Sequence, residues 1–83
     1  EGLVNYARNI EGVKVGFMAR ELDNGKVKIS MRSRDGFNSA VLLKKLGGGG
    51  HAGAAGVTLE MSLEEARATV VAAVSAALGE TDG

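Results

Sequence analysis

The chain has 83 residues, 45% of them hydrophobic and 24% charged, and its formal net charge at pH 7 is zero. This balance is typical of one small globular domain and argues against intrinsic disorder. The chain has no cysteine and no apolar run of about 18 residues, which argues against disulfides, cysteine-ligated metals and a membrane span. We therefore expect a cytoplasmic protein.

The first part of the chain predicts a helix. Leu3, Ala7 and Ile10 fall on one face at helical spacing, so residues 3–10 are expected to be helical. Gly12 is expected to end this helix. The segment is too short to be stable alone and is expected to dock on the core.

A β-hairpin is expected next. Apolar and polar side chains alternate over residues 13–22 and again over 26–32, which is typical of half-buried strands. Asn24-Gly25 lies between them, and both residues tolerate positive φ, so the pair is a strong hairpin signal.

The middle of the chain predicts a short helix. Asn38 or Ser39 is expected to cap its N-terminus, and the helix is expected to run to Leu46. Gly47 occupies the position where a glycine commonly ends a helix.

The last part predicts a strand and a second helix. Residues 54–60 indicate a short strand, and Ser62 with Glu65 forms a capping box. The helix is expected over residues 63–78, with an apolar stripe formed by Leu63, Ala66, Val70, Ala73, Val74 and Ala77. The expected order is αββαβα, an α/β (α+β) fold whose small sheet, built on the hairpin plus one further strand, packs against helices.

The most unusual stretch covers residues 47–56, which are six glycines, three alanines and His51, the only histidine. Such residues let another group approach the backbone closely and leave successive N–H groups free to bind an anion. His51 adds a side-chain hydrogen-bond donor. The stretch predicts a phosphate-binding loop, with a flexible linker as the alternative. It matches neither the P-loop nor the dinucleotide fingerprint.

The charge distribution favours an anionic ligand. Between residues 26 and 51 there are six Lys or Arg residues and one acid, a local charge of +5. Arg32 and Arg34 are two apart and are expected to share a strand face, where guanidinium groups suit phosphate. The alternative is a solvated strand face. A lone histidine without cysteine or clustered carboxylates supports neither a catalytic triad nor a metal site.

Together these residues resemble a known family. Arg32-Ser33-Arg34-Asp35, the Asn-capped helix ending in Lys-Lys-Leu, and the Gly-Gly-Gly-His-x-x-Ala-Ala-Gly pattern are similar to the DHH-associated domain, type 1. That domain is the C-terminal substrate-binding part of DHH phosphoesterases. The resemblance is greatest to bacterial oligoribonucleases that also dephosphorylate 3′-phosphoadenosine 5′-phosphate, a group described as exopolyphosphatase-related.

The resemblance implies that catalysis and substrate binding belong to separate domains. A separate N-terminal domain would carry an Asp-His-His motif and two manganese ions and would perform the hydrolysis. Residues 1–83 would be a single domain of that longer protein, without a cofactor or catalysis of its own. This domain would hold short RNA or nucleotide phosphates and contact the N-terminal domain, and a homodimer is a further expected partnership. The resemblance assigns substrate contacts to Arg32, Arg34, Gly48, Gly49, Gly50, His51, Ala54, Ala55 and Gly56.

Three alternatives remain open from the sequence. The parent protein could be a cyclic-dinucleotide phosphodiesterase or a single-strand DNA exonuclease. The domain could instead be a non-catalytic RNA-binding or dimerisation module, like the related domain of alanyl-tRNA synthetases. It could also be a pure interface domain that holds a dimer, for which the alanine-rich last helix is the candidate surface.

Overall fold

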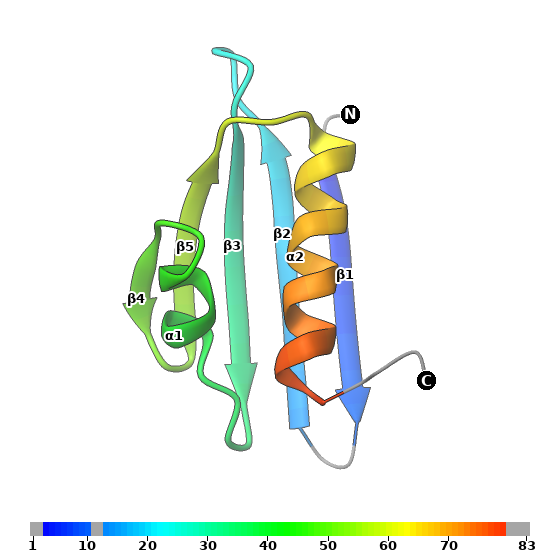
Figure 1. Cartoon of the computed structure of the whole chain (residues 1–83), viewed down its shortest axis with the longest axis vertical. Coiled ribbons are helices and arrows are strands. Elements are labelled where there is room, and N and C mark those ends of the chain that lie inside the picture. The colour runs from blue at the N-terminus through cyan, green and yellow to red at the C-terminus, as the bar shows by residue number, and fades with distance from the viewer. Residues whose placement is uncertain (1–2, 11–12, 80–83) are drawn as a thin grey trace.

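The computed structural model describes residues 3–10 and 13–79 and shows a five-stranded antiparallel sheet with two helices on one face (Figure 1). The strand order across the sheet is β1-β2-β3-β5-β4. Helix α1 covers the β3–β5 side and α2 covers β1 and β2 (Figure 1). The elements are β1 (Leu3–Ile10), β2 (Val13–Glu21), β3 (Val27–Arg34), α1 (Ser39–Lys44), β4 (Gly49–His51), β5 (Ala54–Leu59) and α2 (Leu63–Ala77).

The first element is a strand, and the helix predicted there is wrong. All eight residues of β1 pair with β2. Val4 and Tyr6 alternate toward the core, and the Tyr6 ring lies 5.2 Å from the Phe17 ring. The observed order is therefore βββαββα and not αββαβα. Gly12, expected to end a helix, lies outside the described residues.

The hairpin formed by β2 and β3 confirms the sequence prediction. The two strands pair from Lys14 opposite Arg34 to Glu21 opposite Val27. Gly25 has a φ of 82°, and the Asn24 side-chain oxygen accepts a hydrogen bond of 3.0 Å from the Lys26 N–H. The Asn-Gly turn thus sets the register that decides which side chains share a face.

The other two predicted helices are confirmed, although each is slightly shorter than expected. The Asn38 side chain accepts a 3.0 Å hydrogen bond from the Val41 N–H at the start of α1. At the start of α2, Ser62 and Glu65 form the reciprocal capping box. Gly47 and Gly79 follow the two helices with φ of 98° and 77°.

Removing the α1 cap is expected to lower stability. Asn38→Ala leaves one N–H of the first turn without its partner, so the free energy of unfolding should fall by about 1 kcal/mol. Urea denaturation measures this change. Asn38→Asp keeps the acceptor oxygen and should stay close to the parent value. An equal loss in both variants would contradict a capping role.

The core lies between the sheet and the helices. Each long strand sends alternate side chains into it, and α2 contributes Ala66, Val70 and Val74, which confirms the centre of the predicted stripe. Ala77, at the end of that stripe, is exposed. Because the small Ala66 is fully buried, the helix backbone can lie close to the sheet. The opposite face of the sheet carries neither of the described helices (Figure 1).

Candidate phosphate-binding face

One row of residues crosses the helix-free face from edge to edge. Ala7 on β1 lies beside Gly16 on β2, and Gly16 lies beside Arg32 on β3. Arg32 lies beside Ala54 on β5, and Ala54 lies beside His51 on β4. Cross-strand neighbours share a face, so this row, called here the Arg32–His51 row, places the predicted arginine and the histidine on one surface.

Small neighbours leave Arg32 accessible on this surface. Gly16 and Ala54, on either side, have at most one side-chain carbon each, and Arg32 itself is exposed. Two strand spacings, about 10 Å, separate the backbones of Arg32 and His51. A long arginine side chain and a phosphate group together span such a gap. The row can therefore present a guanidinium and an imidazole to one anion.

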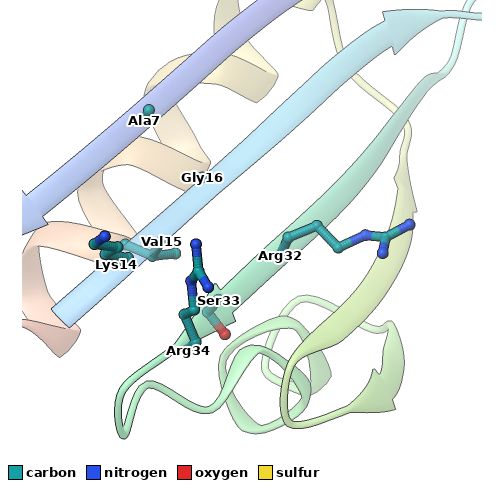
Figure 2. Close-up of a pocket in the computed structure, with 7 residues that line it drawn as sticks. All are labelled: Ala7, Lys14, Val15, Gly16, Arg32, Ser33 and Arg34. Carbon is teal, nitrogen blue, oxygen red and sulfur yellow. The ribbon is translucent and has the colours of Figure 1, made fainter.

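The two predicted arginines lie on the same face but extend differently. Figure 2 shows Arg34 near Lys14, at neighbouring strand ends, while Arg32 extends away from both, toward the β5 side of β3. All three residues line a surface depression of about 670 Å³ whose floor includes Ala7 and Gly16. Arg32 is thus the arginine nearer to His51, and Arg34 belongs with Lys14.

The glycine-rich stretch is not a simple loop, because residues 49–51 form the short edge strand β4. A Cβ atom at Gly48 would collide with the Gly56 carbonyl oxygen and lie 2.5 Å from the Val57 Cβ. Gly50 has a φ of 145°, and a Cβ there would lie 2.6 Å from the Ala55 Cα. The fold itself therefore requires glycine at positions 48 and 50, which sequence reasoning did not foresee.

Gly49 is different from its two neighbours. A Cβ built at Gly49 has none of the described atoms within 4 Å, and its φ lies outside the left-handed region. It pairs with Gly56 on the helix-free face, and neither residue of this pair adds a side chain to the surface. As an edge strand, β4 also leaves part of its N–H and C=O groups without a strand partner. The packing of the fold does not require glycine at position 49. Close approach of a ligand to the backbone would explain why a glycine stands there.

The alanines after His51 do not share one role. Ala54 lies on the helix-free face in the Arg32–His51 row. Ala55 lies on the opposite face with its register partner Gly50 and packs against the core. Gly56 returns to the helix-free face, opposite Ser30 and Gly49.

Lys28 belongs to this surface, and sequence reasoning had not named it as a site residue. Its Cε and Nζ atoms lie 3.5 Å from the position of a Cβ at Gly56, so the side chain passes over that glycine. The signal was present in the sequence, because Lys28 alternates in phase with Arg32 on a predicted strand.

A serine pair ties the β4–β5 turn to the end of β3. The Ser33 and Ser39 hydroxyls are 2.6 Å apart, and Ser33 Oγ lies 3.0 Å from the Ala52 carbonyl oxygen. Two backbone bonds reinforce this contact, from the Ser33 N–H to Gly53 O and from the Ser39 N–H to Ala52 O. The turn next to His51 is thereby held in place beside Arg32.

The face has a strongly basic character. Within the described ranges, the four strand rows that cross β2 and β3 contain no carboxylate on this face. The one ion pair between described residues, Lys26 to Glu60 at 3.4 Å, lies beyond these rows, past the start of β3. The cations on the rows are Lys14, Arg20, Lys28, Arg32 and Arg34.

Metal-type side chains are not gathered here. No group of three His, Cys, Asp or Glu residues in the described part of the chain is placed to hold a metal ion. Nor does either described helix have the length and apolar character needed to cross a membrane.

The fold and this face define a small domain with a basic, glycine-bordered sheet surface. The DHHA1 domain family matches residues 1–80, and the chain belongs to that family. Among curated proteins, the chain is 43% identical over 74 residues to the bifunctional oligoribonuclease and PAP phosphatase NrnA of Thermus thermophilus. The match covers 88% of this chain and 22% of that protein.

Proposed function

We propose that this chain is the substrate-binding domain of a DHH-family phosphoesterase and binds the phosphate groups of short oligoribonucleotides or phosphorylated nucleosides. The observation that carries the proposal is the Arg32–His51 row on a surface that the helices leave open. The similarity to NrnA supports this substrate class. Because the chain spans 22% of that relative, the activity of the whole protein is part of the proposal.

Arg32 and His51 of the row, and the glycines beside it, have distinct parts in binding. The Arg32 guanidinium offers paired N–H donors that suit the oxygens of a phosphate. His51 donates from the other side, at the edge strand. Gly49 adds no side chain to the edge strand beside His51, so the ligand can reach the backbone there. The contribution of this chain is to hold and orient the phosphate for a reaction.

Hydrolysis itself is assigned to a separate domain of the whole protein. The manganese ions that the family implies do not fit the described residues, which contain no cluster of metal-type side chains. They would be held by a separate catalytic domain of the parent protein. This chain alone is therefore expected to bind phosphate esters without cleaving them.

The proposal is tested by calorimetric titration of 3′-phosphoadenosine 5′-phosphate into the protein that carries this chain. His51→Ala should weaken binding by about 1.5–3 kcal/mol, roughly 10- to 100-fold, because a charge-assisted hydrogen bond is lost. His51→Gln retains an N–H donor and should recover part of the affinity. Binding that is unchanged in His51→Ala would make the histidine structural.

A substrate panel separates the remaining alternatives. Turnover of short oligoribonucleotides and 3′-phosphoadenosine 5′-phosphate by the whole protein is the expected result. Preference for a cyclic dinucleotide would identify the whole protein as a cyclic-dinucleotide phosphodiesterase, and preference for single-stranded DNA would identify it as a single-strand DNA exonuclease. Absence of turnover with retained RNA binding would favour the non-catalytic binding module.

A further inference from the structure

Two pairs of like charges face each other directly on the helix-free face. Lys14 on β2 is the register partner of Arg34 on β3, and Arg20 is the register partner of Lys28. Like charges in directly opposite positions destabilise a sheet. Neither pair is buried, and the packing of the core uses none of these four side chains. The fold therefore gives no reason for these unfavourable pairs.

The two pairs lie at opposite ends of the same surface. Six residues separate Lys14 from Arg20 along β2, which corresponds to about 20 Å of strand. Arg32 lies between them, one row from the Lys14–Arg34 pair and two rows from the Arg20–Lys28 pair. The positive charge is thus drawn out in a line along the strands and is not concentrated at one point.

A shallow trough follows this line from the Lys14–Arg34 pair as far as Met18 and Ser30, one row short of the Arg20–Lys28 pair. The depression of about 670 Å³ beside Lys14 and Arg34 is joined by one of about 540 Å³ that reaches Asn5, Met18 and Ser30. Ala7, Gly16 and Arg32 line both depressions. The floor at Gly16 is low for a packing reason, since a Cβ there would lie 2.9 Å from the Tyr6 carbonyl oxygen.

We propose that the helix-free face is a track for a single-stranded oligonucleotide, in which the Lys14–Arg34 and Arg20–Lys28 pairs bind phosphates beyond the one held by Arg32 and His51. A linear polyanion neutralises both pairs at once and so offsets the repulsion within them. A single compact phosphate can relieve only one pair. The inference rests on the proposed function, because it extends the same surface to further phosphates.

The test is a length series on the protein that carries this chain. Binding of 5′-phosphorylated dinucleotides and pentanucleotides is measured by fluorescence anisotropy at several salt concentrations. The double variant Lys14→Gln/Arg20→Gln should lose about tenfold in pentanucleotide affinity, with the slope of log affinity against log salt reduced by about 0.7 for each lost contact. Dinucleotide affinity should hardly change.

The control is Lys44→Gln/Lys45→Gln, which removes the same charge from the α1 end on the other side of the sheet. This control variant should still bind pentanucleotides more tightly than dinucleotides. An equal loss of pentanucleotide affinity in both double variants would indicate general electrostatics and overturn the track. Equal competition by inorganic polyphosphate would overturn its assignment to nucleic acid. If the unmutated protein does not bind the dinucleotide, the proposed function itself is contradicted. A failure of the track and a failure of the proposed function therefore give different results.

Discussion

Arg32→Ala is expected to weaken binding of 3′-phosphoadenosine 5′-phosphate by about 10- to 100-fold, the equivalent of 1.5–3 kcal/mol for a lost charge-assisted contact. Arg32 is exposed, lies at the centre of the Arg32–His51 row and extends toward the β5 side of β3 (Figure 2). Its truncation therefore removes a ligand contact without opening a cavity in the core. Calorimetric titration of the parent protein and the variant gives the difference directly.

Two further variants give this experiment its controls. Arg32→Lys keeps the charge but loses the planar pair of donors, so its affinity should fall between those of the parent protein and Arg32→Ala. Arg67→Ala removes an exposed arginine from α2, on the covered face of the sheet, and should bind like the parent protein. If Arg67→Ala lost as much affinity as Arg32→Ala, the effect would belong to overall charge and not to this face.

Gly48→Ala is expected to have the largest effect on stability among the glycine substitutions. Its Cβ would collide with the Gly56 carbonyl oxygen and press on Val57, a core residue. Relief requires β5 to move, so the free energy of unfolding should fall by about 1–3 kcal/mol. Denaturant unfolding of the two proteins measures the loss.

Gly49→Ala is the matched comparison, one residue further along the chain. A Cβ at this position meets none of the described atoms within 4 Å, so stability should stay within about 0.5 kcal/mol of the parent value. Affinity for a phosphate ligand should nevertheless decrease, because the added methyl group occupies the surface of the β4 strand. A Gly49→Ala protein that is strongly destabilised, or a Gly48→Ala protein that is not, would contradict the assigned roles.

Local signals predicted the part of the fold that depends on local chemistry. The Asn24-Gly25 turn, the Asn38 cap and the Ser62–Glu65 box each act within a few residues, and each is present as the sequence indicates. Such features depend little on the rest of the chain, and this is why they could be read without a structure.

The two elements that sequence reasoning missed depend on distant partners. Leu3 and Ala7 fit a helical face, but Val4 and Tyr6 fit alternation equally well, and a segment this short does not decide between the two. Residues 3–10 form a strand because they pair with β2. Residues 49–51 are poor strand formers by composition. They pair with β5 because Gly48 and Gly50 allow a close backbone approach that no local rule predicts.

The candidate site was predictable in its residue types and not in its arrangement. Arg32 and His51 stood out by charge and by uniqueness, but only the order of β3, β5 and β4 places them in one row. The same register removes Ala55 from the face and adds Lys14, Arg20 and Lys28. A one-residue slip of any of these strands would have turned that strand's side chains to the other face of the sheet.

The most direct test of the account is a crystal structure of the parent protein with a phosphorothioate dinucleotide that carries a 5′-phosphate. The account predicts a phosphate on the helix-free face, with its oxygens within hydrogen-bond distance of the Arg32 guanidinium and the His51 ring and with its closest backbone contact at Gly49. A ligand bound instead on the helix-covered side, in the pocket that Val41 of α1 and Ala73 of α2 line, or one that touches neither Arg32 nor His51, would contradict it.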